Sequence, residues 1–123
     1  MIDENFILIN EVGLRDGLQG VAQKVAIEQR IKIIDILIES GLRAIQVCSF
    51  VNPKKIPQMN NAEELVKKLP KKRNISYSAF ILNQYGLKRA FNSGIKKVET
   101  SIAVSETYSQ KNMGISIIKA QEN

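Results

Sequence analysis

The chain has 123 residues, of which 44% are hydrophobic, and carries a formal net charge of +6. This length allows one domain at most and the hydrophobic fraction is ordinary for a globular protein, but no run approaches the roughly 18 apolar residues of a membrane span. With no histidine and a single cysteine, Cys48, the sequence argues against a zinc site or a disulfide within the chain.

Residues 6–50 predict a strand, a helix and a second strand. A short apolar run rich in branched side chains, which ends at Gly13, predicts the first strand over residues 6–12. Over residues 24–40 the apolar positions recur at helical spacing, and one face of this helix would carry Ile27, Ile31, Ile34 and Ile38. Gly41 follows as a natural C-terminal cap. A second apolar run predicts a strand over residues 44–50.

A short helix is expected after the proline-containing loop at residues 51–60. Asn61, with Glu64 three residues later, resembles a capping box, and the helix would run toward Pro70. The basic run at residues 67–73 then supplies much of the net charge. It could bind an anion such as nucleic acid or a phosphorylated ligand, or form a solvated helix end whose lysines complement the helix dipole. No aromatic residue interrupts the run, so we expect no nucleic-acid partner.

The alternation continues along the rest of the chain. Strands are predicted over residues 75–82 and 97–104, and Gly94 would close the helix between them, whose apolar face is marked by Leu87, Ala90 and Phe91. Four strand–helix alternations with short links imply an α/β fold with a parallel sheet.

The final residues predict one more helix. Ser116 is a candidate N-cap for a helix over residues 117–122, which has only about two turns. A crossover helix that covers a strand should be longer. We therefore expect a truncated chain, with a naturally short terminal helix as the alternative.

The residues most suited to chemistry lie where the first strand ends. Ile7, Ile9 and Glu11 would share one strand face by the period of two, and an acid is costly there if it is buried alone. Arg15 offers a fixed cation for a developing enolate or carboxylate. Asp16 offers a hard oxygen ligand for a divalent metal. The alternative is a structural Arg–Asp pair.

Three segments resemble those of the hydroxymethylglutaryl-CoA lyases. Residues 11–19 resemble the family's signature, with Leu14 where a proline is typical, and residues 49–59 and 105–112 resemble its loops after strands two and four. The resemblance covers nearly the whole chain. It implies the first half of a (β/α)8 TIM barrel, with residues 1–123 as the N-terminal half of the domain.

The resemblance also implies roles for individual residues. Asp16 matches the family's first metal ligand, for Mg or Mn, and Arg15 matches the arginine that binds substrate and stabilises the enolate. Glu11 matches an active-site acid. Gln46 stands where the family usually has a glutamate, which is a departure because an amide carries no charge and is no base. Gln46 would still bind substrate through hydrogen bonds, and the substrate pocket would also be lined by Gln19 and Ser49, unless these are turn or packing residues.

The family's remaining metal ligands, a His-x-His pair and an asparagine, have no match in this sequence, nor does its loop cysteine. Cys48 is expected to be a packing residue. The resemblance implies cleavage of hydroxymethylglutaryl-CoA to acetyl-CoA and acetoacetate, with this chain alone inactive. The alternatives are a sister acyltransferase resembling isopropylmalate or homocitrate synthase, or a non-catalytic half-barrel. We expect a homo-oligomer or a separate second half-barrel as partner, no membrane association and a cytoplasmic location, because the first residues resemble no targeting segment.

Overall fold

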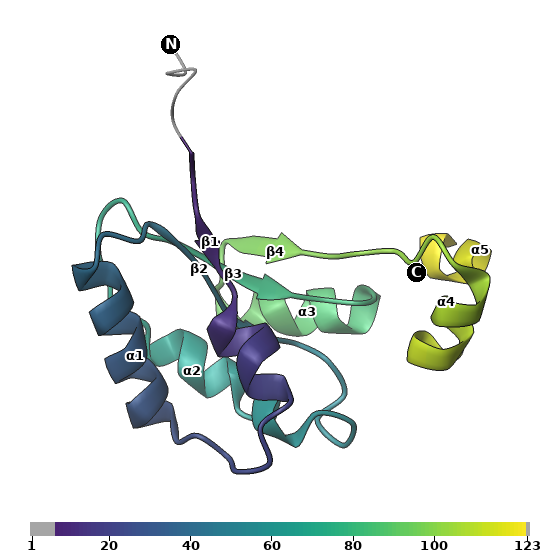
Figure 1. The fold of residues 1–123 in the computed structure, drawn as a ribbon, viewed down its shortest axis with the longest axis horizontal. Helices are drawn as coiled ribbons and strands as arrows, with labels where there is room; N and C mark the ends of the chain where they lie inside the picture. Colours follow the sequence, from purple (N-terminus) through teal and green to yellow (C-terminus); the bar gives the residue numbers. More distant parts are fainter. Residues whose placement is uncertain (1–6, 123) are drawn as a thin grey trace.

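In the computed structural model, which describes residues 7–122, a four-stranded parallel sheet is built from strands that alternate with helices (Figure 1). In chain order the elements are β1 (Asn10–Glu11), the helical turn η1 (Gly13–Gly17), α1 (Ile27–Glu39), β2 (Ala44–Ser49), the 3-10 turn η2 (Pro57–Met59), α2 (Ala62–Lys68), β3 (Ser76–Phe80), α3 (Gln84–Ser93), β4 (Lys97–Glu99), α4 (Glu106–Met113) and α5 (Ile117–Glu122). The strand order is β1-β2-β3-β4 and every neighbouring pair is parallel.

The apolar core lies between the sheet and helices α1, α2 and α3. All six residues of β2 are buried, as expected for a central strand of a parallel sheet. The predicted face of α1 is confirmed, since Ile27 and Ile34 are buried and Ile31 and Ile38 pack against the core. The core residues from the other elements include Val47 and Cys48 of β2, Leu65 of α2, Ala79 of β3 and Ala90 of α3.

The sheet is strongly curved. Adjacent strands are roughly 4.8 Å apart, so β1 and β4 would lie about 14 Å apart in a flat sheet. Yet Asn10 Nδ2 on β1 donates a hydrogen bond to Glu99 Oε1 on β4 at 3.1 Å. Side chains from the two outer strands can meet in this way only if the sheet bends around them, as the wall of a barrel does.

The edge strands are shorter than predicted. Instead of residues 6–12, β1 comprises Asn10–Glu11, and Phe6 lies outside the described residues. The expectation that Ile7 and Ile9 share a strand face with Glu11 is wrong, because both isoleucines precede the strand and are exposed. The last strand likewise ends at Glu99 rather than at Val104, which is 99% exposed. Among the described residues β1 and β4 each pair with one neighbouring strand only. Fewer ladder hydrogen bonds therefore hold their ends in an extended conformation.

Helix ends agree with the sequence where glycine or serine determines them. Gly41 and Gly94, which follow α1 and α3 in the chain, adopt positive φ values of 100° and 86°. Ser116 Oγ accepts from Lys119 N at the start of α5. The predicted capping box of α2 is wrong, because Asn61 makes no side-chain cap and instead accepts from Arg30 Nη1 at 3.3 Å.

The basic run begins in the last turn of α2, which contains Lys67 and Lys68. Lys68 also pairs with Glu28 and Glu64, each at 3.1 Å. This arrangement favours the solvated helix end over an anion site. No helix among residues 7–122 is long and apolar enough to cross a membrane.

We predict that Gly86→Ala destabilises the chain although alanine is the better helix former by about 1 kcal/mol. A Cβ at Gly86 would lie 2.6 Å from the backbone oxygen of Phe50, so α3 would have to move away from the end of β2. The free energy of unfolding, measured with denaturant at one fixed chain concentration, should fall by roughly 1–3 kcal/mol.

Gly20→Ala is the matched control for Gly86→Ala, because nothing lies within 4 Å of a Cβ at that position. It should leave stability unchanged or slightly raised. Equal effects of the two substitutions would contradict the close approach of α3.

We also predict that the chain self-associates through the open edges of its sheet, because unpaired edges template further strand pairing. Ile9→Lys, directly before β1, and Val98→Lys, on β4, place a charge beside each edge and should shift sedimentation toward the monomer. Ile36 on α1 is 63% exposed, close to the 61% of Ile9, but lies on a helix, so Ile36→Lys should leave association unchanged. A sharp monomer peak of the unsubstituted chain at high concentration would count against this prediction.

Candidate active site

Arg15 and Asp16 lie in η1, directly after β1. The backbone N–H groups of both residues donate to Val12 O, at 3.0 and 2.7 Å, which closes a tight turn at the carboxyl end of the strand. Gly13 and Gly17 bound this turn. The turn thereby projects both side chains over the end of the sheet, where parallel α/β folds usually carry their active sites.

The Arg15 guanidinium is held by three different elements. Its Nε donates to Gln46 Oε1 on β2 at 2.5 Å, and Nη1 donates to Asp16 Oδ1 at 2.9 Å. The group also stacks over the Phe80 ring of β3, with Cζ 4.7 Å from the ring centroid. The Arg15 side chain is 17% exposed and that of Asp16 is 59% exposed. Arg15 is therefore fixed, whereas Asp16 faces solvent.

A carboxylate on β4 completes this network. Gln46 Nε2 donates to Glu99 Oε2 at 2.6 Å, and Asn10 Nδ2 donates to Glu99 Oε1. Burial by itself raises the pKa of Glu99. The Ser78 hydroxyl, the Asn10 amide and the Lys97 ammonium outweigh burial, so this pKa lies below its ordinary value of 4.5. Glu99 is thus an anion in the fold.

Sequence reasoning missed Glu99 and Asn10. The available signal was an acid in a predicted strand, the same signal that singled out Glu11.

Of the other predicted site residues, Gln19 and Ser49 lie close to the Arg15 network and Glu11 does not. Gln19 Nε2 donates to Asp16 Oδ1 at 3.1 Å, so it joins the Arg15 group. Ser49 is buried and pairs in register with Phe80, the ring beneath Arg15. Glu11 is not brought to Arg15: its carboxylate accepts from Gly13 N at 2.6 Å. The Glu11 side chain lines a hollow against α1 with Ile33 and Leu37.

The described residues do not by themselves form a metal centre. Among residues 7–122 no group of three or more His, Cys, Asp or Glu side chains is placed to hold a metal ion. Asp16 offers one carboxylate, and a hard cation such as Mg or Ca takes about six oxygen ligands. Asp16 can therefore be one ligand of a larger set, but not a site alone.

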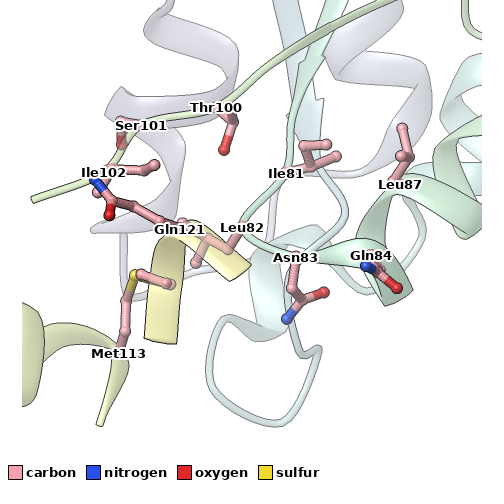
Figure 2. Close-up of a pocket in the computed structure, with 11 residues that line it drawn as sticks. Ile81, Leu82, Asn83, Gln84, Leu87, Thr100, Ser101, Ile102, Met113 and Gln121 are labelled. Atoms are coloured by element: carbon pink, nitrogen blue, oxygen red, sulfur yellow. The ribbon is translucent and has the colours of Figure 1, made fainter. Parts of the chain in front are cut away.

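A second hollow, of about 210 Å³, lies at the ends of β3 and β4, beside α5 (Figure 2). Its walls include Ile81, Leu87, Ile102 and Met113, and polar side chains such as Gln84 and Gln121 lie among them. It is lined by none of the Arg15 network, although both the hollow and Arg15 follow the carboxyl ends of strands.

Two arginines on the helical side hold the backbone of β2 and of the loop that follows it. Arg89 of α3 donates to both carboxylate oxygens of Glu63, at 2.7 and 3.0 Å, and to Val51 O at 2.9 Å. Arg30 of α1 is 1% exposed and donates to Val47 O at 2.9 Å. The two arginines are far apart in sequence, yet they contact backbone oxygens only four residues apart, at Val47 and Val51. They position the strand end that carries Gln46 and Ser49.

These features coincide with a known family. The HMGL-like family model matches residues 6–123. The chain belongs to the HMGL-like family. Among curated relatives, the hydroxymethylglutaryl-CoA lyase of Pseudomonas mevalonii is 35% identical over 116 residues, which are 94% of this chain and 38% of that enzyme. The human mitochondrial hydroxymethylglutaryl-CoA lyase is 40% identical over 111 residues, 90% of this chain and 34% of that enzyme.

Solved structures of HMGL-like proteins share the fold. The hydroxymethylglutaryl-CoA lyase of Pseudomonas aeruginosa matches with a TM-score of 0.88 at 37% identity, over 94% of this chain and 39% of that one. A lyase from Acinetobacter baumannii, solved with coenzyme A and 3-methylmalate, matches with a TM-score of 0.88 at 29% identity, over 94% and 38% of the two chains. The chain thus spans somewhat over a third of the length of these relatives. The prediction of the first half of a (β/α)8 barrel is confirmed.

We predict that Cys48 is inert in the folded chain. It is fully buried, and burial raises the pKa of its thiol to about 12, so almost no thiolate forms near neutral pH. Because it is the only cysteine, labelling with a chromogenic disulfide reagent reports on it alone. Labelling should be very slow without denaturant and should track unfolding when urea is added. Fast labelling of folded chain would contradict the prediction.

Proposed function

We propose that this chain supplies the Arg15 side of the active site of a hydroxymethylglutaryl-CoA lyase-type enzyme, which cleaves a carbon–carbon bond to give acetyl-CoA and acetoacetate. The observation that carries the proposal is the fixed Arg15 guanidinium at the carboxyl ends of the strands, beside the exposed Asp16. The lyase names of the relatives and the coenzyme A in the Acinetobacter structure support an acyl-CoA substrate.

The reaction needs a base, a cation and a place for developing charge. Removal of the proton from the tertiary hydroxyl allows the carbon–carbon bond to break. The alkoxide carbon becomes the ketone of acetoacetate, and the electron pair passes to the other fragment as an enolate, which takes up a proton to give acetyl-CoA. Arg15, already anchored through Nε, would meet the enolate oxygen with its remaining N–H groups without a large reorganisation. The Arg15 network does not assign the base.

A divalent cation, Mg or Mn, would supply Lewis-acid chemistry to the substrate oxygens when bound. Asp16 would be one of its ligands, and the others would come from outside the described residues. Gln19 and Ser49 would line the substrate region next to Arg15. Glu11, which the resemblance implies is an active-site acid, would first have to leave Gly13 N. A cytoplasmic location and assembly with a second half-barrel or a further copy belong to the same proposal.

A non-catalytic half-barrel is the second candidate. It is favoured by Gln46, an amide where the resemblance implies a glutamate, and by the lack, among the described residues, of three or more side chains grouped to hold a metal ion. Turnover measurements decide between the two candidates.

We predict that the 123-residue chain alone does not turn over hydroxymethylglutaryl-CoA, because Asp16 by itself leaves a cation largely hydrated and weakly held. Purified chain should produce no acetoacetate in a coupled assay. Turnover that is lost on Asp16→Ala would contradict this prediction and would favour a complete site within the chain.

We predict that a completed barrel, made by joining the chain to the remaining part of the Pseudomonas aeruginosa lyase, cleaves hydroxymethylglutaryl-CoA. Arg15→Met should lower kcat by on the order of 10²-fold with a smaller effect on KM, because the enolate charge appears only as the bond breaks. Asp16→Asn should weaken metal binding, since a neutral amide is a poorer ligand for a hard cation.

Added Mg or Mn separates these two roles. It should recover part of the rate of the Asp16→Asn enzyme and none of that of the Arg15→Met enzyme. If both variants lost activity only in proportion to lost folded protein, the pair would be structural and the proposed function would fail at this site.

A further inference from the structure

The inner face of the sheet carries a carboxylate that the proposed function leaves without a role. Glu99 on β4 is in register with Phe80 of β3, and its side chain is 28% exposed. It reaches across β3 to accept from Gln46 Nε2 on β2 at 2.6 Å. On its other oxygen it accepts from Asn10 Nδ2 on β1 at 3.1 Å. A surface glutamate on an edge strand would have no reason to be held by amides from two other strands.

The amide of Gln46 lies between a group that only donates and a group that only accepts. A guanidinium has no acceptor and an ionised carboxylate has no donor, whereas an amide has one of each. Gln46 Oε1 faces Arg15 Nε, and Gln46 Nε2 faces Glu99. The flipped amide would set N–H against N–H on one side and oxygen against oxygen on the other. Arg15 and Glu99 together therefore determine the orientation of the amide, and Glu99 holds its Nε2 end.

We propose that Glu99 is a positioning residue: it fixes the orientation of Gln46 and, through that amide, holds the Arg15 guanidinium over Phe80. Glu99 and Gln46 act as one unit. The negative charge of this unit lies on β4, and the oxygen that accepts from Arg15 is presented from β2. The effect of this unit on catalysis rests on the proposed function, but the geometry does not.

The charges around Glu99 are consistent with this role. Lys97 Nζ lies 3.7 Å from Glu99 Oε1 along the same strand. From η1, the Arg15 cation lies beyond the Gln46 amide, and Asp16 is on the far side of Arg15. With cations on both sides, Glu99 stays ionised, which its lowered pKa also indicates. Asn10 keeps the carboxylate turned toward the interior.

A charge-swap cycle tests the proposal. E99Q removes the anion that holds Gln46 Nε2, so only a neutral amide at position 99 and Arg15 itself remain to orient Gln46. Q46E sets a second carboxylate against Glu99 in place of the amide contact, which is unfavourable unless one of the two takes up a proton. The double variant Q46E/E99Q moves the acid onto β2, where it can accept directly from Arg15, and places an amide on β4. Each single change should be harmful and the double change should recover what they lose.

The first measurement uses the 123-residue chain and needs no activity. In ¹⁵N spectra, the Arg15 Nε–H resonance should move toward the position of an exposed arginine in E99Q and return in the double variant. The denaturation midpoint, at a fixed chain concentration, should follow the same pattern. Glu39→Gln, at the exposed end of α1, removes the same charge away from the sheet and should change neither.

The second measurement uses the completed barrel. E99Q and Q46E should each lower kcat by about tenfold or more with a smaller change in KM, and the double variant should recover most of the loss, because a misoriented Arg15 weakens the transition state more than substrate binding.

The proposal would be overturned if the losses in stability or kcat of the two single variants simply added up in the double variant. It would also be overturned if the Arg15 Nε–H resonance did not move in E99Q. If the single variants do not fold, recovery of the fold in the double variant supports it and failure there overturns it. If no completed barrel turns over substrate, the proposed function fails, while the spectra of the chain still decide whether Glu99 positions Arg15.

Discussion

The arrangement of this half-barrel depends on one requirement: the Arg15 guanidinium, largely enclosed at the end of the sheet, must find acceptors there. A buried or half-buried cation is costly unless its donors are satisfied. The acceptors come from Gln46 and Asp16, and the charge balance extends through Gln46 to Glu99 and on to Asn10. This chain of hydrogen bonds runs from β1 and η1 through β2 to β4. It links the inner side of the whole sheet and is compatible only with a curved one.

The helical side of the sheet keeps those partners in register. Gly86 lets α3 approach the Phe50 backbone, and Arg89 ties Val51 to Glu63 of α2. Arg30 holds Val47 O from α1. These contacts are made to backbone in β2 or directly after it. They therefore fix where β2 places Gln46 relative to Arg15. A packing change behind the sheet would therefore alter the polar network in front of it.

Local patterns predicted the parts of the fold that local forces determine. The isoleucine face of α1 and the glycine caps at Gly41 and Gly94 follow from helical spacing and from the conformational freedom of glycine. The ends of β1 and β4 could not be read in this way, since strand length depends on the neighbouring strand. Helix α4 was missed because its sequence is polar and has no apolar period; Ser105 Oγ, which accepts from Tyr108 N at 3.3 Å, marks its start.

The same limit applies to the candidate site. Arg15 and Asp16 are neighbours in sequence and were found from it, together with Gln19 three residues on. Glu99 lies 53 residues from Gln46 and 89 from Asn10, and only the curvature of the sheet brings them together. The resemblance identified Gln46 as a departure but could not supply its partner, because that partner is on another strand.

The geometry divides the guanidinium of Arg15 into two parts. Nε points to Gln46 and is held by the interior network, whereas Nη1 points to Asp16, whose side chain is exposed. An incoming oxygen would compete with Asp16 for the Nη1 donor and would leave the Nε contact in place. Arg15 could then exchange a protein carboxylate for a substrate oxygen without losing its orientation. That exchange needs a rigid anchor on the Nε side, which a lone neutral amide provides poorly and an amide oriented by a partly buried anion provides well.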